Sequence, residues 1–224
     1  WSSKRTMSVA QKLYEEGLIT YHRTDSTNIA KSAIDKVRDF IFKNYGEKHL
    51  PEAPRFYKTK SKVAQEAHEA IRPTDVSISK LKSQNSNLQT GEERLYELIW
   101  KKFVASQMEA SVYDETTIDV EALRQAQGVY VLRASGQIMK FDGWRKVLPS
   151  KMTEEQVAKL PDVEPNEPLQ LIKVDPQQKF TEPPPRYNEA SLIKTLEKLG
   201  IGRPSTYAPT ISTIQMRQYV EKEE

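Results

Sequence analysis

The stretch TMSVAQKLYEEGLITYHRTDS, residues 6–26, contains the change from helix to extended chain around which the rest of the sequence is arranged. Val9 and Leu13 stand four residues apart, and this spacing predicts the inward face of a helix. The helix is expected to cover residues 6–17, because glycine is typical of a residue that ends a helix. A short extended segment, residues 18–23, is expected to follow.

The extended segment contains the most informative pair of side chains, Tyr21 and Arg23. Side chains two positions apart on an extended chain share a face, so both residues can reach one chemical group. A phenol is a poor nucleophile at neutral pH, but a nearby guanidinium favours the phenolate and can bind a phosphate through two parallel hydrogen bonds. This pair suits attack on a phosphodiester. The spacing alone is also common on ordinary protein surfaces.

A second stretch, AHEAIRP at residues 67–73, offers His68. We expect a short helix over Ala64–Ile71 that Pro73 stops from continuing. His68 is either a helix residue satisfied by Glu69 or solvent, or a hydrogen-bond donor to the same phosphate. It is not part of a zinc signature, because the second histidine of His-Glu-x-x-His is missing.

A third stretch, GIGRPSTY at residues 200–207, has the composition of an anion site at the start of a helix. Free backbone N–H groups and the helix dipole attract phosphate, and Arg203 adds a full charge. The alternative is a plain turn between helices, with Ser205 as the N-cap of a last helix that reaches Arg217. Two arginines and no acidic residue occur between Ile201 and Tyr219, which favours a polyanion.

The remaining pattern predicts a mixed α and β fold with several lobes. Three more helices are expected, one capped by Ser26 or Thr27 and ending near Tyr45, one over Glu92–Met108, and one over Asn188–Leu199 ended by glycine. A small antiparallel β unit is expected between them, with strands near Val112–Val120, Val129–Leu132, Ile138–Phe141 and Leu169–Ile172, and turns at Gly128, Ser135–Gly136 and Asp142–Gly143. We therefore predict three domains, residues 1–108, 109–176 and 177–224.

Composition narrows the function classes. Lys and Arg number 34 against 31 Asp and Glu, a net charge of +3, so any nucleic-acid contact must come from local patches. The absence of cysteine excludes disulfides, a thiolate nucleophile and cysteine zinc sites, and fits a reducing compartment. No run approaches the roughly 20 apolar residues of a membrane span. The chain opens without Met and without a signal peptide's apolar centre, so we expect a fragment of a longer protein.

Taken together, these stretches resemble the central part of the bacterial type IA DNA topoisomerases. The resemblance spans nearly the whole chain, and its phrases occur in the family's order: KRTM and AQKLYE at 4–7 and 10–15, the segment around Tyr21, QEAHEAIRP at 65–73, FDGW at 141–144, FTEPP at 180–184, EASL at 189–192 and GIGRPSTY at 200–207.

The resemblance implies catalytic roles. Tyr21 would attack single-stranded DNA, form a 5′-phosphotyrosine bond and release a 3′-hydroxyl that later religates, so that no ATP is needed. Arg23 would hold the scissile phosphate, and His68 would support the cleavage-competent arrangement. Asp25 would orient Arg23 or contact a neighbouring domain.

The resemblance also implies an extended DNA contact and a moving lobe. Gln11 and Glu15 would line the site, and the strand leading into it would be held by four further residues, Arg203, Ser205, Thr206 and Arg217. The helical domain that carries the tyrosine would be a lid that lifts to pass the other strand. The β-rich domain would be part of the arch on which that lid swings.

Three departures from the family pattern stand out. His22 occupies a position where methionine is more usual, and Gln218 follows Arg217 where glycine is usual. The Asp-x-Asp pair of the family's Mg²⁺ site does not occur, so we expect no metal ligands here and a Mg²⁺ site in another domain of the full-length enzyme. The fragment alone is therefore expected neither to relax DNA nor to cleave it efficiently. Its expected partner is single-stranded or underwound DNA, and we expect a monomer in the bacterial cytoplasm, at the nucleoid.

Other functions fit less well. A tyrosine recombinase normally needs several scattered Arg and His residues, and a relaxase needs a cluster of metal-binding histidines, whereas only His22, His49 and His68 are present. A non-catalytic single-stranded DNA-binding module explains the last third of the chain but not Tyr21, Arg23 and His68. A related type IA enzyme, such as reverse gyrase or topoisomerase III, also remains open as the parent.

Overall fold

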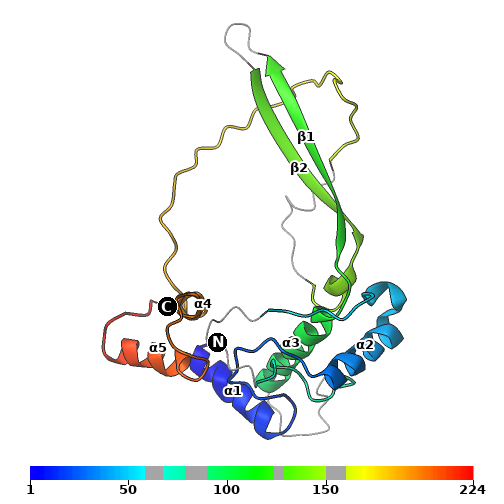
Figure 1. Cartoon of the computed structure of the whole chain (residues 1–224). Helices are drawn as coiled ribbons and strands as arrows, with labels where there is room; N and C mark the ends of the chain where they lie inside the picture. Colours follow the sequence, from blue (N-terminus) through cyan, green and yellow to red (C-terminus); the bar gives the residue numbers. More distant parts are fainter. Residues whose placement is uncertain (59–67, 79–89, 124–128, 150–159, 224) are drawn as a thin grey trace. The chain divides into compact units, whose positions relative to one another are not determined.

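The computed structural model describes residues 1–58, 68–78, 90–123, 129–149 and 160–223. Within these ranges it contains five α-helices, two short 3-10 helices and one pair of antiparallel strands, which confirms the mixed α and β class (Figure 1). In chain order the elements are α1 (Ser3–Glu15), α2 (Lys31–Tyr45), η1 (Glu47–His49), α3 (Thr90–Ser106), β1 (Val112–Leu123), β2 (Val129–Phe141), η2 (Gly143–Lys146), α4 (Glu189–Leu199) and α5 (Tyr207–Met216).

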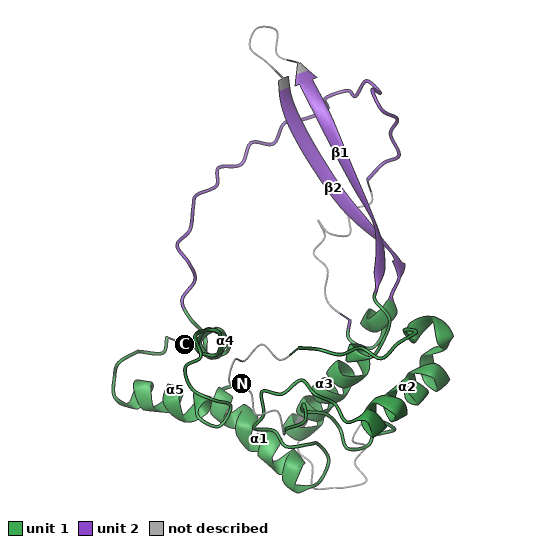
Figure 2. Ribbon diagram, in the orientation of Figure 1, with its two compact units in different colours: residues 1–110, 143–148, 187–224 green, residues 111–142, 149–186 purple. Residues whose placement is uncertain are grey.

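The chain divides into two compact units, shown in two colours in Figure 2. Unit 1 comprises Trp1–Ala110, Gly143–Leu148 and Tyr187–Glu224, and unit 2 comprises Ser111–Asp142 and Pro149–Arg186. The N-terminal half of the sequence and its C-terminal segment from Tyr187 onward therefore share one unit. The division into three domains stays a prediction.

The core of unit 1 lies among α1, α2, α3 and the segments that connect them. Two buried aromatic residues of α3 fasten the segment that follows residue 74: Trp100 Nε1 donates to the Val76 carbonyl at 2.8 Å, and the Tyr96 hydroxyl donates to the Ile78 carbonyl at 2.9 Å. The buried indole N–H and the buried phenol O–H thus each have a partner, which avoids a desolvation cost. The fully buried apolar side chains around them are Leu13, Ile19, Val37, Ile41, Val104 and Met108.

Helix caps decide the helix starts, and several differ from the expectation. α1 begins earlier, because the Ser2 hydroxyl accepts from the Arg5 N–H at 3.2 Å. The expected cap of α2 at Ser26 or Thr27 is wrong: α2 follows Ala30 without a side-chain cap, and the Ser26 hydroxyl accepts from the Asn28 N–H instead. Such local hydrogen bonds compete with helix formation.

The two C-terminal helices show one prediction confirmed and one corrected. α4 has the expected limits, with a reciprocal cap at Asn188 and Gly200 in the left-handed conformation at its end. The N-cap position of α5 is Thr206, not Ser205, and Arg217 is its C-cap. The Thr206 hydroxyl faces backward, accepting from the Arg203 N–H at 2.8 Å, so it stabilises the turn rather than the helix.

In unit 2, β1 and β2 form an antiparallel hairpin in which β2 is one continuous strand (Figure 1). The expected turn at Ser135–Gly136 is wrong, because these residues pair with Thr117 and Thr116. Cross-strand ion pairs, Arg133–Asp119 at 2.7 Å and Lys140–Asp114 at 2.8 Å, accompany this register.

Two further expectations fail within the described residues. Leu169–Ile172 is not a strand, and Ile172 is 96% exposed, because apolar composition does not make a strand without an adjacent partner. Residues 68–71 are not helical, and the rest of the predicted Ala64–Ile71 helix lies outside the described residues, as does the Gly128 turn. No helix in the described ranges has the length and apolar character of a bilayer span.

Candidate active site

The segment before Tyr21 is fixed by backbone pairing with residues that lie far along the chain. Ile19 and Pro73 form an antiparallel bridge, flanked by hydrogen bonds from the Thr20 N–H to the Arg72 carbonyl at 2.9 Å and from the Thr74 N–H to the Leu18 carbonyl at 3.0 Å. The Thr20 side chain joins the same pairing, donating to the Ala70 carbonyl at 2.7 Å and accepting from the Arg72 N–H at 2.9 Å. This antiparallel pairing brings His68 beside Tyr21.

A carboxylate fastens the segment that carries His68. Glu69 accepts from the Ala30 N–H at 2.6 Å and pairs with Arg72 at 2.8 Å. Burial alone would raise the pKa of Glu69, but the hydrogen bonds from Arg72 and from the Ala30 N–H hold that pKa below its usual value. The position of His68 therefore depends on a charged Glu69. The Glu69 carboxylate binds the Ala30 backbone N–H and Arg72 rather than the His68 imidazole.

Tyr21 lies in a cluster of aromatic rings that leaves it accessible. Its ring centroid is 5.8 Å from that of His68, 5.3 Å from Tyr14 and 5.5 Å from His22, each pair meeting edge to face. The Tyr21 residue remains 40% exposed. The candidate nucleophile is thus beside the predicted imidazole and in contact with solvent, not sealed in the core.

A chain of side chains on the exposed face of α1 holds Arg23. The Arg23 guanidinium donates to the Gln11 side-chain oxygen at 3.2 Å, and the Gln11 amide donates to Glu15 at 2.8 Å. Gln11 and Glu15 stand four apart on α1 and so share one side of the helix. Three residues that the sequence suggested for the site are therefore connected, and Arg23 has donors left for a phosphate.

His22 points the other way from its two neighbours in sequence. It is only 5% exposed, and neither ring nitrogen has a hydrogen-bond partner among the described residues. Burial lowers the pKa of the His22 imidazole below its usual 6.5, the Arg23 cation lowers it further, and Glu15 offsets part of the effect. The ring also packs against Tyr14, at 5.9 Å between centroids.

The turn before α5 approaches the tyrosine segment through Asp25. Burial raises the pKa of the Tyr207 phenol, and the carboxylates of Glu197 and Asp25 raise it further, so Asp25 and Tyr207 lie close enough to interact. Arg203, Ser205, Thr206 and Arg217 are exposed, and among the described residues none of them forms a hydrogen bond or a ring contact with Tyr21. Gly202 has a φ of 81°, and a Cβ there would press on Tyr207 at 3.1 Å.

Two tyrosines at the site were missed by sequence reasoning. Tyr14 is packed against both Tyr21 and His22, and Tyr207 lies near Asp25. A signal for Tyr14 exists, because it lies on the last turn of the helix that leads into the nucleophile segment. Nothing in the sequence pattern indicates that Tyr207 lies near Asp25.

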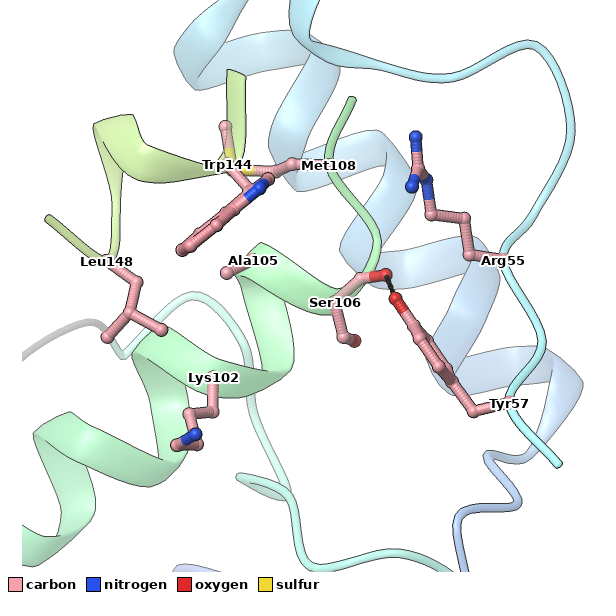
Figure 3. A pocket seen from close by; sticks show the side chains of 8 residues that line it. All are labelled: Arg55, Tyr57, Lys102, Ala105, Ser106, Met108, Trp144 and Leu148. Carbon is pink, nitrogen blue, oxygen red and sulfur yellow. Dashed lines mark hydrogen bonds between the residues drawn. The ribbon is translucent and has the colours of Figure 1, made fainter. Parts of the chain in front are cut away.

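Unit 1 also contains a cavity of about 270 Å³ that Tyr21, Arg23 and His68 do not line (Figure 3). Trp144, Met108 and Leu148 form its apolar side. Arg55 pairs with Glu109 at 2.7 Å, and the Tyr57 hydroxyl donates to the Ser106 carbonyl at 2.7 Å. These polar groups tie the segment around residue 56 to the end of α3, and the cavity is separate from the tyrosine site.

Metal binding finds no support in the side chains of the described residues. Within the described ranges, no three His, Asp or Glu side chains gather in an arrangement that could hold an ion. The described side chains therefore do not fit a Mg²⁺ site.

Comparison with known proteins places these features in a family. A family model described as DNA topoisomerase matches residues 1–224. Proteins named DNA topoisomerase 1 from Pasteurella multocida, Pseudomonas aeruginosa and Escherichia coli are 55%, 54% and 49% identical over 98%, 97% and 98% of this chain.

A solved structure agrees with these relatives. Full-length topoisomerase I from Thermotoga maritima matches with a TM-score of 0.78 and 36% identity, covering 100% of this chain and 36% of that one. The chain spans about 24% of the length of the curated relatives. The accessible tyrosine has an imidazole and a guanidinium near it, and the similarity to these proteins extends along the whole sequence. The chain therefore belongs to the bacterial type IA DNA topoisomerase family.

Proposed function

We propose that this chain is the part of a type IA DNA topoisomerase that carries the nucleophile, Tyr21. The phenol oxygen attacks a phosphodiester of single-stranded DNA and loses its proton. A 5′-phosphotyrosine bond forms, and the 3′ oxygen leaves as a hydroxyl. Reversal of the same step reseals the strand after passage of another strand, and negative supercoils are relaxed without ATP because the bond energy stays in the link to tyrosine.

The observation that carries this proposal is the exposed Tyr21 ring set edge to face against His68, beside an Arg23 whose guanidinium is held from α1. Arg23 binds the scissile phosphate and stabilises the charge that develops during attack. His68 donates a hydrogen bond to the same phosphate, and Gln11 and Glu15 set the direction of Arg23. Asp25 connects the nucleophile segment to the turn before α5.

The DNA strand leading to Tyr21 is held by four exposed residues, Arg203, Ser205, Thr206 and Arg217. Two of them, Arg203 and Arg217, are cations, which suits the phosphate oxygens of the DNA backbone. The helical domain acts as the lid and the β-rich domain as part of the arch. The partner is single-stranded or underwound DNA, and the enzyme works as a monomer in the cytoplasm, at the nucleoid.

The chain by itself is proposed to be inactive. Mg²⁺ belongs to another domain of the full-length enzyme, where it supports religation. Incubating the 224-residue chain with negatively supercoiled plasmid and Mg²⁺ should give no relaxation, whereas the full-length enzyme should relax the same plasmid. Clear relaxation by the chain would contradict this part of the proposal.

The decisive experiment compares wild type with Tyr21→Phe in the full-length enzyme. Both are incubated with a single-stranded oligonucleotide labelled at its 3′ end, and the reaction is stopped with SDS. The wild type should yield a labelled covalent adduct and Tyr21→Phe none, while both bind the oligonucleotide with similar affinity. Adducts that persist in Tyr21→Phe place the nucleophile elsewhere. A wild type that binds without ever forming adducts favours a non-catalytic DNA-binding module.

A further inference from the structure

His22 is a buried residue of the site to which the proposed reaction assigns no role. It follows the nucleophile directly in the sequence, yet it is only 5% exposed. Both of its ring nitrogens lack a hydrogen-bond partner among the described residues. A buried imidazole normally pairs at least one nitrogen, because an unpaired buried polar atom costs free energy. Its burial in this form therefore calls for a reason beyond packing.

The contacts of His22 suggest that reason. Its ring lies 5.5 Å from Tyr21 and 5.9 Å from Tyr14, between centroids, and Tyr14 itself meets Tyr21 at 5.3 Å. The three rings thus touch one another, with His22 on the inner side and the Tyr21 ring resting on the other two. Because His68 meets Tyr21 separately at 5.8 Å, the orientation of the nucleophile depends on all three neighbours.

We propose that His22 is a positioning residue for Tyr21, that it supports the nucleophile only as a neutral ring, and that its protonation disturbs this support and lowers DNA cleavage. This inference rests on the proposed role of Tyr21. An imidazolium at this place would bring a charge into a buried aromatic cluster with no acceptor for its two N–H groups among the described residues.

The charged and titratable groups around His22 agree with a neutral ring. From its own segment, the cation of Arg23 opposes protonation, and from α1 the exposed carboxylate of Glu15 favours it only in part. Tyr14 and Tyr21 are the other titratable groups in contact with His22, whereas the His68 ring lies against Tyr21. The pKa of His22 is accordingly lowered from 6.5, chiefly by burial.

The sign of the pH effect follows from this shift. A histidine whose pKa is lowered in the folded protein is neutral and in place above its usual value, and its support is lost as pH falls from about 6.5 through the lowered pKa. Cleavage should fall about twofold at the pH where half of His22 is protonated, and about tenfold one pH unit below it.

The test measures each protein's adduct yield relative to its own yield at pH 8, using the full-length enzyme and the 3′-labelled oligonucleotide. Wild type, His22→Met and His49→Gln are compared from pH 5 to 8. Methionine is of similar size but cannot titrate. His49→Gln is the matched control, since the His49 side chain contacts the Tyr45 carbonyl at 2.9 Å, outside the tyrosine cluster.

A second readout does not depend on activity. Exchange of the C2 proton of each histidine, followed by mass spectrometry across the same pH range, gives the pKa of His22 in the intact enzyme. We expect this pKa to lie below 6.5 and to coincide with the midpoint of the loss of adduct, and we expect the loss to shrink in His22→Met and to remain in His49→Gln.

Each other outcome overturns the inference. An acid loss that is unchanged in His22→Met, or one that vanishes only in His68→Gln, assigns the titration to another group. A measured pKa of His22 at or above 6.5 would show that the folded protein does not favour the neutral ring, which the inference requires. These failures leave the proposed function intact, whereas adducts in Tyr21→Phe would remove the proposed function itself.

Discussion

Replacing Gly143 with alanine should destabilise unit 1 strongly, because this glycine lies directly against another stretch of backbone. Gly143 begins η2 with a φ of 48°, and a Cβ built on it would lie 2.5 Å from the carbonyl carbon and oxygen of Ala110 and 2.6 Å from the Glu109 oxygen. The neighbouring Trp144 N–H donates to that same Glu109 oxygen at 2.9 Å. Alanine would therefore have to separate two backbones that a hydrogen bond holds together.

The size of the effect follows from three costs. A left-handed φ at a non-glycine residue costs about 1–2 kcal/mol. Relief of the overlap with backbone atoms, which cannot rotate away, costs about 1–3 kcal/mol, as for other overpacked sites. Loss of the Trp144 hydrogen bond costs about 1 kcal/mol. We expect a decrease of about 4 kcal/mol in the free energy of unfolding, a large share of a typical total of about 5–15 kcal/mol.

Gly200→Ala is the matched control. Gly200 also has a left-handed φ, 73°, but a Cβ there would meet nothing within 4 Å, so only the conformational cost of about 1–2 kcal/mol applies. Urea unfolding of the three proteins, followed by tryptophan fluorescence, measures the difference. If Gly143→Ala lost no more stability than Gly200→Ala, the reasoning from backbone overlap would be refuted.

Three other changes test separate parts of the structure. Gln218 has a φ of 58°, so Gln218→Gly should raise the free energy of unfolding by about 0.5–1 kcal/mol in the same urea experiment, and a loss of stability would contradict the turn geometry. Burial raises the pKa of Tyr96 to about 12, so the neutral phenol stabilises the fold below pH 10, and this contribution of about 3 kcal/mol is lost between pH 10 and 12. Tyr96→Phe should therefore flatten the plot of unfolding free energy against pH in this range. An unaltered plot would exclude Tyr96 as the titrating group. Gln11→Ala removes the hydrogen bond to Arg23, worth about 1 kcal/mol, and should slow adduct formation about fivefold in the full-length enzyme, whereas an unchanged rate would show that Arg23 needs no such support.

Local sequence signals predicted those features that depend on neighbouring residues. Asn188 and Gly200 bound α4 as expected, because a polar N-cap and a left-handed glycine act within one turn of the helix. Local sequence signals gave wrong predictions where the same residues can adopt either of two local structures. The Ser26 hydroxyl satisfies the Asn28 N–H in a turn, so α2 begins later, and Ser135–Gly136 continues β2 because the facing strand pairs with it.

The sequence by itself determined the chemistry available to this protein: Tyr21 and Arg23 on one extended segment, the His68 stretch, and the order of motifs that marks the family. The tertiary structure alone decided which of these groups meet. Antiparallel pairing at Ile19 and Pro73 places His68 against Tyr21, and packing beneath the same segment buries His22 while leaving its neighbours exposed. The physical reason is that periodicity and capping act over a few residues, whereas burial and long-range hydrogen bonds depend on which distant segment supplies the other surface.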